Sequence, residues 1–141
     1  MRSEGKKTVI FICTHNSARS QMAEGLLRNL YGGRFDVYSA GAEPSRVNPY
    51  AVRVMKEIGI DISDHSSKSI DAYEGECFDY VVTVCDKANE SCPVFPGRGK
   101  HIHKGFRDPA AFRGKDEEIM DGFRAVRDEI KDWVVSEFGA K

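Results

Sequence analysis

Long apolar runs are missing from this sequence, and so is any excess of basic residues. No stretch approaches the roughly 20 consecutive apolar residues that cross a bilayer. The polar N-terminus, residues 1–7, lacks the apolar segment and the small-residue cleavage site of a secretory signal. The 21 Lys and Arg residues are balanced by 22 Asp and Glu residues, which leaves a net charge of -1. Because proteins that bind nucleic acids or membrane surfaces usually carry an excess of basic residues, we expect a cytoplasmic protein that binds neither.

The 141 residues include four cysteines, Cys13, Cys77, Cys85 and Cys92. A chain of this length fits one domain, residues 1–141, and buries enough surface to fold without disulfide staples. In a reducing cytosol, cysteines are more often catalytic, metal-binding or simply buried than part of a disulfide framework. The four thiols are therefore the first candidates for chemistry.

Two kinds of apolar periodicity alternate along the chain. Continuous apolar runs rich in β-branched residues, typical of buried strands, cover residues 8–12 and 80–84. Residues 35–40 are expected to form a further strand that ends at Gly41, and residues 101–103, more weakly, a short one. Apolar residues recur at helical spacing in three segments. The first follows the polar loop after residues 8–12 and ends at Gly32, the second runs from Pro49 to Gly59, and the third runs from about Lys115 to Phe138. The pattern predicts a single α/β domain with an open, mostly parallel four-stranded sheet and helices on both faces. Functional loops in such folds lie at the carboxyl ends of the strands.

A polar loop, residues 13–20 with the sequence CTHNSARS, joins the first strand to the next helix. In such a loop, successive backbone N–H groups point inward and the helix N-terminus adds partial positive charge, which makes an anion site. Arg19 supplies a planar guanidinium that matches two oxygens of a tetrahedral oxyanion. The same groups, with the hydroxyl of Ser17 or Ser20, would stabilise a Cys13 thiolate as nucleophile. The alternative is that Cys13 is a buried structural thiol.

The strand VIFI and the loop CTHNSARS together resemble the catalytic loop of thioredoxin-coupled arsenate reductases, which share a fold with low-molecular-weight protein tyrosine phosphatases. The similarity extends from Val9 to about Phe138. The phosphatase loop has Gly where this chain has His15 and a second Cys where it has Ala18, which favours the reductase branch. The resemblance implies that arsenate is the substrate and that the loop binds it, through Thr14, His15, Asn16, Ser17, Ala18, Arg19 and Ser20.

Cys85 and Cys92 lie seven residues apart, in the segment CDKANESCP after the third predicted strand. Reducing arsenate takes two electrons, which one dithiol supplies when it becomes a disulfide. A regular helix would hold the two α-carbons about 10 Å apart, beyond the roughly 4.4–6.8 Å of a disulfide. We therefore expect residues 85–92 to be mobile and Cys92 to move on oxidation. Two alternatives are that both thiols are inert, or that they bind a metal with His101 and His103, although the spacing matches no common zinc pattern.

Asp108 is the candidate general acid. Pro109 stiffens the turn that would aim its carboxyl group, and in both related families an Asp-Pro pair late in the chain supplies the acid that protonates the leaving oxygen. The alternative is a cap for the last helix, since Asp is a favoured capping residue. Cys77 lies in a polar stretch away from the other markers, and we expect it to have no role.

Some arsenate reductases of this type bind potassium beside the loop. By resemblance, Asn16, Glu24 and Ser39 match three of the potassium positions, and Lys68 stands at the fourth, where those enzymes have Asp. A lysine ammonium there would take the place of the cation. We therefore expect weak or no dependence on potassium, and neither a bound metal nor an organic cofactor.

The resulting prediction is an arsenate reductase that works by a disulfide relay. The Cys13 thiolate attacks arsenic while Asp108 protonates the departing hydroxide. Cys85 then attacks Cys13 and releases arsenite, and Cys92 attacks Cys85 to leave a disulfide that thioredoxin reduces. We expect a monomer. The main alternative is a phosphatase that hydrolyses tyrosine phosphate or a small phosphoester with Cys13, Arg19 and Asp108; a third is a non-catalytic module that binds a metal or an oxyanion.

Overall fold

The structure, a computed structural model, describes residues 5–86, 95 and 97–139. Its elements, with η for a 3-10 turn, are β1 (Lys7–Cys13), α1 (Arg19–Tyr31), β2 (Phe35–Gly41), α2 (Pro49–Lys56), η1 (Ile70–Tyr73), β3 (Tyr80–Thr83), β4 (Lys100–His103), η2 (Pro109–Ala111) and α3 (Asp116–Phe138). All four strands predicted from the sequence are present, and each predicted helical segment forms an α-helix. None of the described helices has the length and apolar character needed to cross a membrane.

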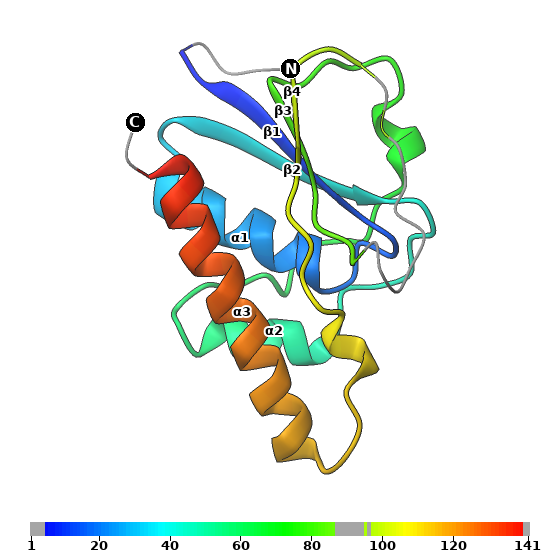
Figure 1. Cartoon of the computed structure of the whole chain (residues 1–141), viewed down its shortest axis with the longest axis vertical. Coiled ribbons are helices and arrows are strands. Elements are labelled where there is room, and N and C mark those ends of the chain that lie inside the picture. The colour runs from blue at the N-terminus through cyan, green and yellow to red at the C-terminus, as the bar shows by residue number, and fades with distance from the viewer. Residues whose placement is uncertain (1–4, 87–94, 96, 140–141) are drawn as a thin grey trace.

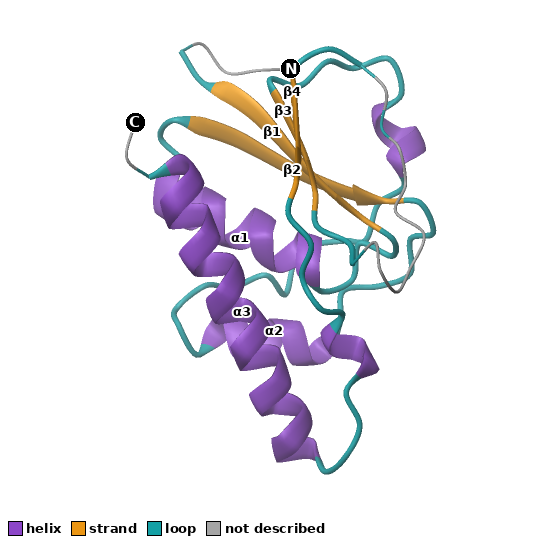
Figure 2. Ribbon diagram, viewed as in Figure 1, coloured by secondary structure: helices purple, strands orange, loops and turns teal. Residues whose placement is uncertain are grey.

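The four strands form one parallel sheet in the order β2-β1-β3-β4 (Figure 2). β1 lies inside the sheet because its run is apolar toward both faces, and Val9 to Ile12 are fully buried. The register pairs Cys13 with Gly41 of β2, and Ile12 with Thr83 of β3. The carboxyl ends of these strands therefore meet at one edge of the sheet, where the loop after β1 begins.

The two faces of the sheet are covered unequally. Val9 and Phe11 pack in the main core with residues of all three α-helices, and Figure 1 shows α1, α2 and α3 together on that side. On the other face, Ile10 and Ile12 pack in a smaller cluster with η1 and with aromatic side chains such as Phe78. The predicted fold class is confirmed, with α-helices on one face and a short 3-10 turn on the other.

α2 begins where the sequence predicts it, and its start also supports the loop. The Asn48 side chain accepts the Tyr50 N–H at 2.8 Å, and Pro49 occupies the first helical position. The Asn48 backbone N–H donates to the carbonyl of Ser17 at 2.9 Å. α2 is held against α3 by Arg127, which is largely buried and donates to the Val54 carbonyl of α2 at 2.8 Å. The packing of α2 on α3 thus fixes one support of the loop.

Candidate functional site

The loop between β1 and α1 turns its carbonyl groups outward. Four successive carbonyl oxygens accept hydrogen bonds from other segments: Thr14 from the Glu43 N–H at 2.8 Å, His15 from the Ser67 hydroxyl at 2.8 Å, Asn16 from the Gln21 amide at 3.2 Å, and Ser17 from the Asn48 N–H at 2.9 Å. In a trans peptide the carbonyl and the following N–H point in opposite directions. The N–H groups of residues 15–18 therefore face the inside of the loop, which is the geometry that an oxyanion cradle requires.

Asn16 and Gly41 determine the course of the loop. A Cβ at Gly41 would lie 2.8 Å from the Asn16 backbone nitrogen, so the close approach of β2 to the loop requires glycine. Asn16 has a left-handed backbone with φ of +50°, which asparagine tolerates better than most residues. Its buried Nδ2 donates to Ser20 Oγ at 2.8 Å and Ser39 Oγ at 2.9 Å. Its Oδ1 accepts the Lys68 N–H at 2.8 Å, so three segments anchor this one side chain.

Cys13 and Arg19 face the same small cavity. Cys13 ends β1 and is a free thiol with 2% exposure, and Arg19 begins α1 with the same 2%. The Arg19 Nη1 donates to the Phe106 carbonyl at 3.3 Å, and Nη2 lies 3.7 Å from Asp108 Oδ2. The cavity measures about 200 Å³ and is lined by Cys13, His15, Ser17, Ala18, Arg19, Ser45, Asp108 and Ala110. The structure thus brings the predicted nucleophile, guanidinium and acid together.

Asp108 takes part in two interactions at once. Its Oδ1 accepts the Ala110 N–H at 2.9 Å and caps η2, in which the buried Pro109 is the first residue. Its Oδ2 faces Arg19, and the side chain is 35% exposed. The cap expected as an alternative is therefore real, but it serves η2 and not α3. It is compatible with a role in the cavity, because the two oxygens of one carboxylate act separately.

Cys85 lies just beyond β3, at the same edge of the sheet as Cys13. Ile12 pairs with Thr83, so Cys13, the last residue of β1, and Cys85, two residues after β3, lie at the carboxyl ends of adjacent strands. Cys85 is fully buried and disulfide-bonded, whereas Cys13 and Cys77 are free thiols. Cys92 lies outside the described residues, so its predicted movement and the mobility of the segment before it stay predictions.

Two cationic side chains act on Glu24, Arg28 by a salt bridge and Lys68 through its charge. Glu24, which is buried, forms a salt bridge with Arg28 at 2.6 Å and accepts a hydrogen bond from Ser39. The Lys68 ammonium donates instead to the Ser66 carbonyl at 2.6 Å. Burial lowers the pKa of Lys68, and the charge of Glu24 acts against that effect. The i, i+4 spacing of Glu24 and Arg28 on α1 favours their salt bridge. That Lys68 takes the place of potassium, with weak or no dependence on that ion, stays a prediction.

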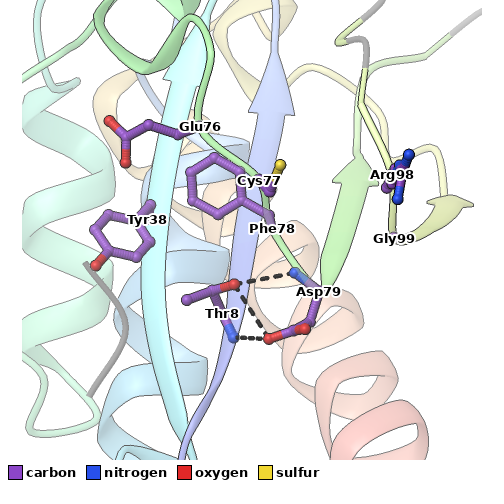
Figure 3. Close-up of a pocket in the computed structure, with 8 residues that line it drawn as sticks. All are labelled: Thr8, Tyr38, Glu76, Cys77, Phe78, Asp79, Arg98 and Gly99. Atoms are coloured by element: carbon purple, nitrogen blue, oxygen red, sulfur yellow. Dashed lines mark hydrogen bonds between the residues drawn. The ribbon is translucent and has the colours of Figure 1, made fainter. Parts of the chain in front are cut away.

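Cys77 belongs to a different part of the molecule, as expected. It lines a pocket of about 350 Å³ with Thr8 and Asp79, near the amino ends of β1 and β3 (Figure 3). Thr8 and Cys13 are five residues apart on one strand, a distance of roughly 16 Å. Within the described part of the chain, no group of three or more His, Cys, Asp or Glu side chains gathers to hold a metal ion.

Comparison with known proteins places this geometry in a family. Residues 8–136 match the family described as low molecular weight phosphotyrosine protein phosphatase, and the chain belongs to it. Within that family, its similarity is to arsenate reductases. The arsenate reductase of Halalkalibacterium halodurans is 52% identical over 125 residues, which cover 89% of this chain and 90% of that protein.

Solved structures agree with this assignment. An arsenate reductase in the phosphate binding state matches with a TM-score of 0.78 at 35% identity, covering 92% of this chain and 95% of that chain. A thioredoxin-dependent arsenate reductase of Corynebacterium glutamicum matches with a TM-score of 0.60 at 29% identity, covering 94% of this chain and 64% of that chain. The resemblance predicted from the sequence is therefore confirmed.

Proposed function

We propose that this chain reduces arsenate to arsenite, with Cys13 as nucleophile and a disulfide relay through Cys85 and Cys92 that thioredoxin restores. The observation that carries the proposal is the free Cys13 thiol in a small cavity shared with the buried Arg19, beside a loop whose N–H groups face inward. Relatives support it as well, because one at 52% identity is named arsenate reductase and one solved relative is thioredoxin-dependent.

Arsenate has the charge and shape that this cavity accepts. The N–H groups of residues 15–18 and the N-terminus of α1 offer donors to its oxygens. Arg19 adds two parallel N–H groups, and its contact with the Phe106 carbonyl holds the guanidinium in place. Because Arg19 is buried, water screens its charge poorly. An anion held in this way presents arsenic to the Cys13 sulfur.

The reaction moves an electron pair from sulfur to arsenic. The Cys13 thiolate forms an S–As bond as hydroxide leaves, and protonated Asp108 gives that hydroxide a proton. Cys85 then attacks the Cys13 sulfur. The S–As bond breaks, its electron pair stays on arsenic, and arsenite leaves with arsenic reduced from the pentavalent to the trivalent state. Cys92 next attacks Cys85, which frees Cys13, and the thioredoxin dithiol reduces the remaining disulfide.

The arrangement of thiols and the wall of the cavity both support this function. A free Cys13 beside a disulfide-bonded Cys85 fits the last stage of the relay. The described residues that line the cavity include no Phe, Tyr or Trp, and its volume of about 200 Å³ is small for a ligand pocket, which usually measures roughly 300–1,000 Å³. A phosphotyrosine ring needs an apolar slot. These features favour a free inorganic oxyanion.

Phosphoester hydrolysis is the second candidate function, because the family match is to phosphotyrosine phosphatases. Cys13, Arg19 and Asp108 would serve it equally well. The substitution Cys92→Ser separates the two. We expect it to abolish arsenate turnover with thioredoxin and to leave any hydrolysis of p-nitrophenyl phosphate unchanged, whereas Cys77→Ser, its control, should retain both activities. Arsenate turnover that survived Cys92→Ser would disprove the relay.

A count of thiols tests the same chemistry without a reductant. Thiol titration before and after addition of arsenate should show a loss of two thiols per chain together with arsenite.

The relay also bears on the compartment and the oligomeric state in which the protein acts. A disulfide that must be reduced in each cycle suits a reducing compartment, and all the cysteines of the relay belong to one chain. We therefore propose that the protein acts as a monomer in the cytoplasm.

A further inference from the structure

A closed ring of hydrogen-bonded side chains joins the loop to α1. In order, it consists of Asn16, Ser39, Glu24, Arg28, His65 and Gln21, with the last bond returning to Asn16. Of these residues, Asn16 alone belongs to the cradle. Gln21 and His65 complete the ring, although neither lines the cavity or enters the proposed reaction.

Gln21 supports the loop directly. It is fully buried, and its Nε2 donates to Asn16 Oδ1 at 3.0 Å and to the Asn16 carbonyl at 3.2 Å. The same nitrogen donates to the Ser66 carbonyl at 3.0 Å. One amide thus holds both the side chain and the backbone of Asn16, whose left-handed conformation shapes the cradle.

The contacts of Gln21 also decide where the proton of His65 lies. Because Gln21 Nε2 is the donor in these bonds, the atom that faces the imidazole is the acceptor Oε1, 3.0 Å from His65 Nδ1. Nδ1 therefore carries the proton. The lone pair on Nε2 accepts from Arg28 Nη1 at 3.3 Å. A second proton, on Nε2, would point an N–H donor at the Arg28 N–H donor and place a positive imidazolium beside the positive guanidinium. The ring of hydrogen bonds therefore closes only while His65 is neutral.

The charges around His65 act in both directions. Burial lowers the pKa of His65, and the carboxylate of Glu24 opposes that effect. Arg28 lowers the pKa further. Within the segment that carries the imidazole, Asp64 raises the pKa and Lys68 lowers it. Burial comes first among these causes, which agrees with the neutral form that the hydrogen bonds require.

We propose that Gln21 and His65 are positioning residues for oxyanion binding: neutral His65 holds Gln21, and Gln21 holds Asn16 in the conformation that forms the cradle. Protonation of His65 opens the ring and weakens oxyanion binding without a change inside the cavity. The inference rests on the proposed function in one respect, that the cavity binds a tetrahedral oxyanion.

Sulfate binding measured by calorimetry between pH 5.5 and 8 tests this, because the charge of sulfate is constant in that range. All proteins carry Cys13→Ser and His15→Asn, which remove the thiol and the imidazole that line the cavity. In this parent we expect affinity to fall toward pH 5.5, and full protonation of His65 to lower it about fivefold, the effect of losing about one hydrogen bond. His65→Asn keeps a donor near the position of Nδ1 but cannot gain a charge, so its affinity should not change with pH. His101→Asn, at an exposed histidine of β4, is the matched control and should keep the parent profile.

The outcomes separate the two claims. If the parent binds sulfate and His65→Asn retains the same loss of affinity at low pH, the inference about His65 is wrong, and the claim that the cavity binds an oxyanion is unaffected. If the parent binds no sulfate at any pH, both the inference about His65 and the claim that the cavity binds an oxyanion are wrong. The unsubstituted protein offers an independent measurement: nitrogen NMR of His65 at pH 7.5 should show a neutral ring with its proton on Nδ1. A charged ring, or a proton on Nε2, would overturn the proposal.

Discussion

The two ends of the sheet each place a cysteine beside a cavity, and they differ in what surrounds the sulfur. At the carboxyl end, Cys13 is buried and shares about 200 Å³ with the buried Arg19. At the amino end, Cys77 is exposed and borders about 350 Å³, where the Asp79 carboxylate already accepts the Thr8 N–H at 2.8 Å (Figure 3). A buried cation is costly unless an anion offsets it. Buried charge therefore distinguishes the candidate site, and cavity volume does not.

The largest contrast is expected between the two cysteines themselves. Cys13→Ser should reduce arsenate turnover by at least about 10⁴-fold, because a serine hydroxyl is neither ionised at neutral pH nor able to form a disulfide. Cys77→Ser should keep kcat/KM within about twofold of the original protein. Arsenite formation coupled to thioredoxin oxidation measures both. A similar loss in the two variants would remove the distinction between the two ends.

The next contrast is between one arginine at each end of the sheet, Arg19 and Arg98. Arg19→Lys keeps the charge but replaces a planar fork with a point charge, so kcat/KM for arsenate should fall about a hundredfold, as for loss of one oxyanion-holding donor. Arg98→Lys, beside the amino-end pocket, should leave kcat/KM unchanged. Thermal unfolding of both variants provides the control for folding. Full activity of Arg19→Lys would show that charge alone suffices in the cradle.

A smaller effect is expected from the glycine against which the loop packs. Gly41→Ala would place a Cβ 2.7 Å from the Thr14 carbonyl oxygen, which backbone atoms relieve only by moving. We expect a loss of about 1–3 kcal/mol in the free energy of unfolding and about a tenfold loss in kcat/KM. Gly33→Ala, where a Cβ meets nothing within 4 Å, is the matched control. Urea unfolding and steady-state kinetics measure the two effects, and an unstrained Gly41→Ala protein would contradict the described loop packing.

The smallest effect is expected at the amino end. Thr8→Val preserves the shape of the side chain but removes the hydroxyl that accepts the Asp79 N–H at 3.0 Å. The free energy of unfolding should decrease by about 1 kcal/mol, while kcat/KM stays the same. Chemical denaturation and kinetics of the same preparation check this. A drop in turnover would mean that the two ends of the sheet are coupled.

Much of the fold could be predicted because its signals are local. The apolar run at residues 8–12 lies within β1, and the Asn48-Pro49 pair starts α2. The short turns η1 and η2 were not predicted. η1 is four residues long and has no fully buried side chain of its own, so it lacks the apolar periodicity by which a helix is recognised. Its stability comes from packing on the second face of the sheet.

The candidate site divides in the same way. Cys13 and Arg19 were predicted from one contiguous loop, and Asp108 from resemblance. The structure then brought Asp108 to 3.7 Å from Arg19. Gln21 and His65 were not assigned a role, because a glutamine in a helix and an isolated histidine are ordinary surface residues in a sequence. The roles of Cys85 and Cys92 in the relay stay predictions.

The sequence by itself determined β1, the loop after it and the candidate nucleophile, because strand pattern, polar loop and helix start are contiguous and act through neighbouring residues. The tertiary structure alone decided that His65 reaches Gln21, 44 positions away, and Arg28, 37 positions away. Contacts of that kind depend on which segments the sheet and α1 bring together in space, and no local spacing of residue types encodes them.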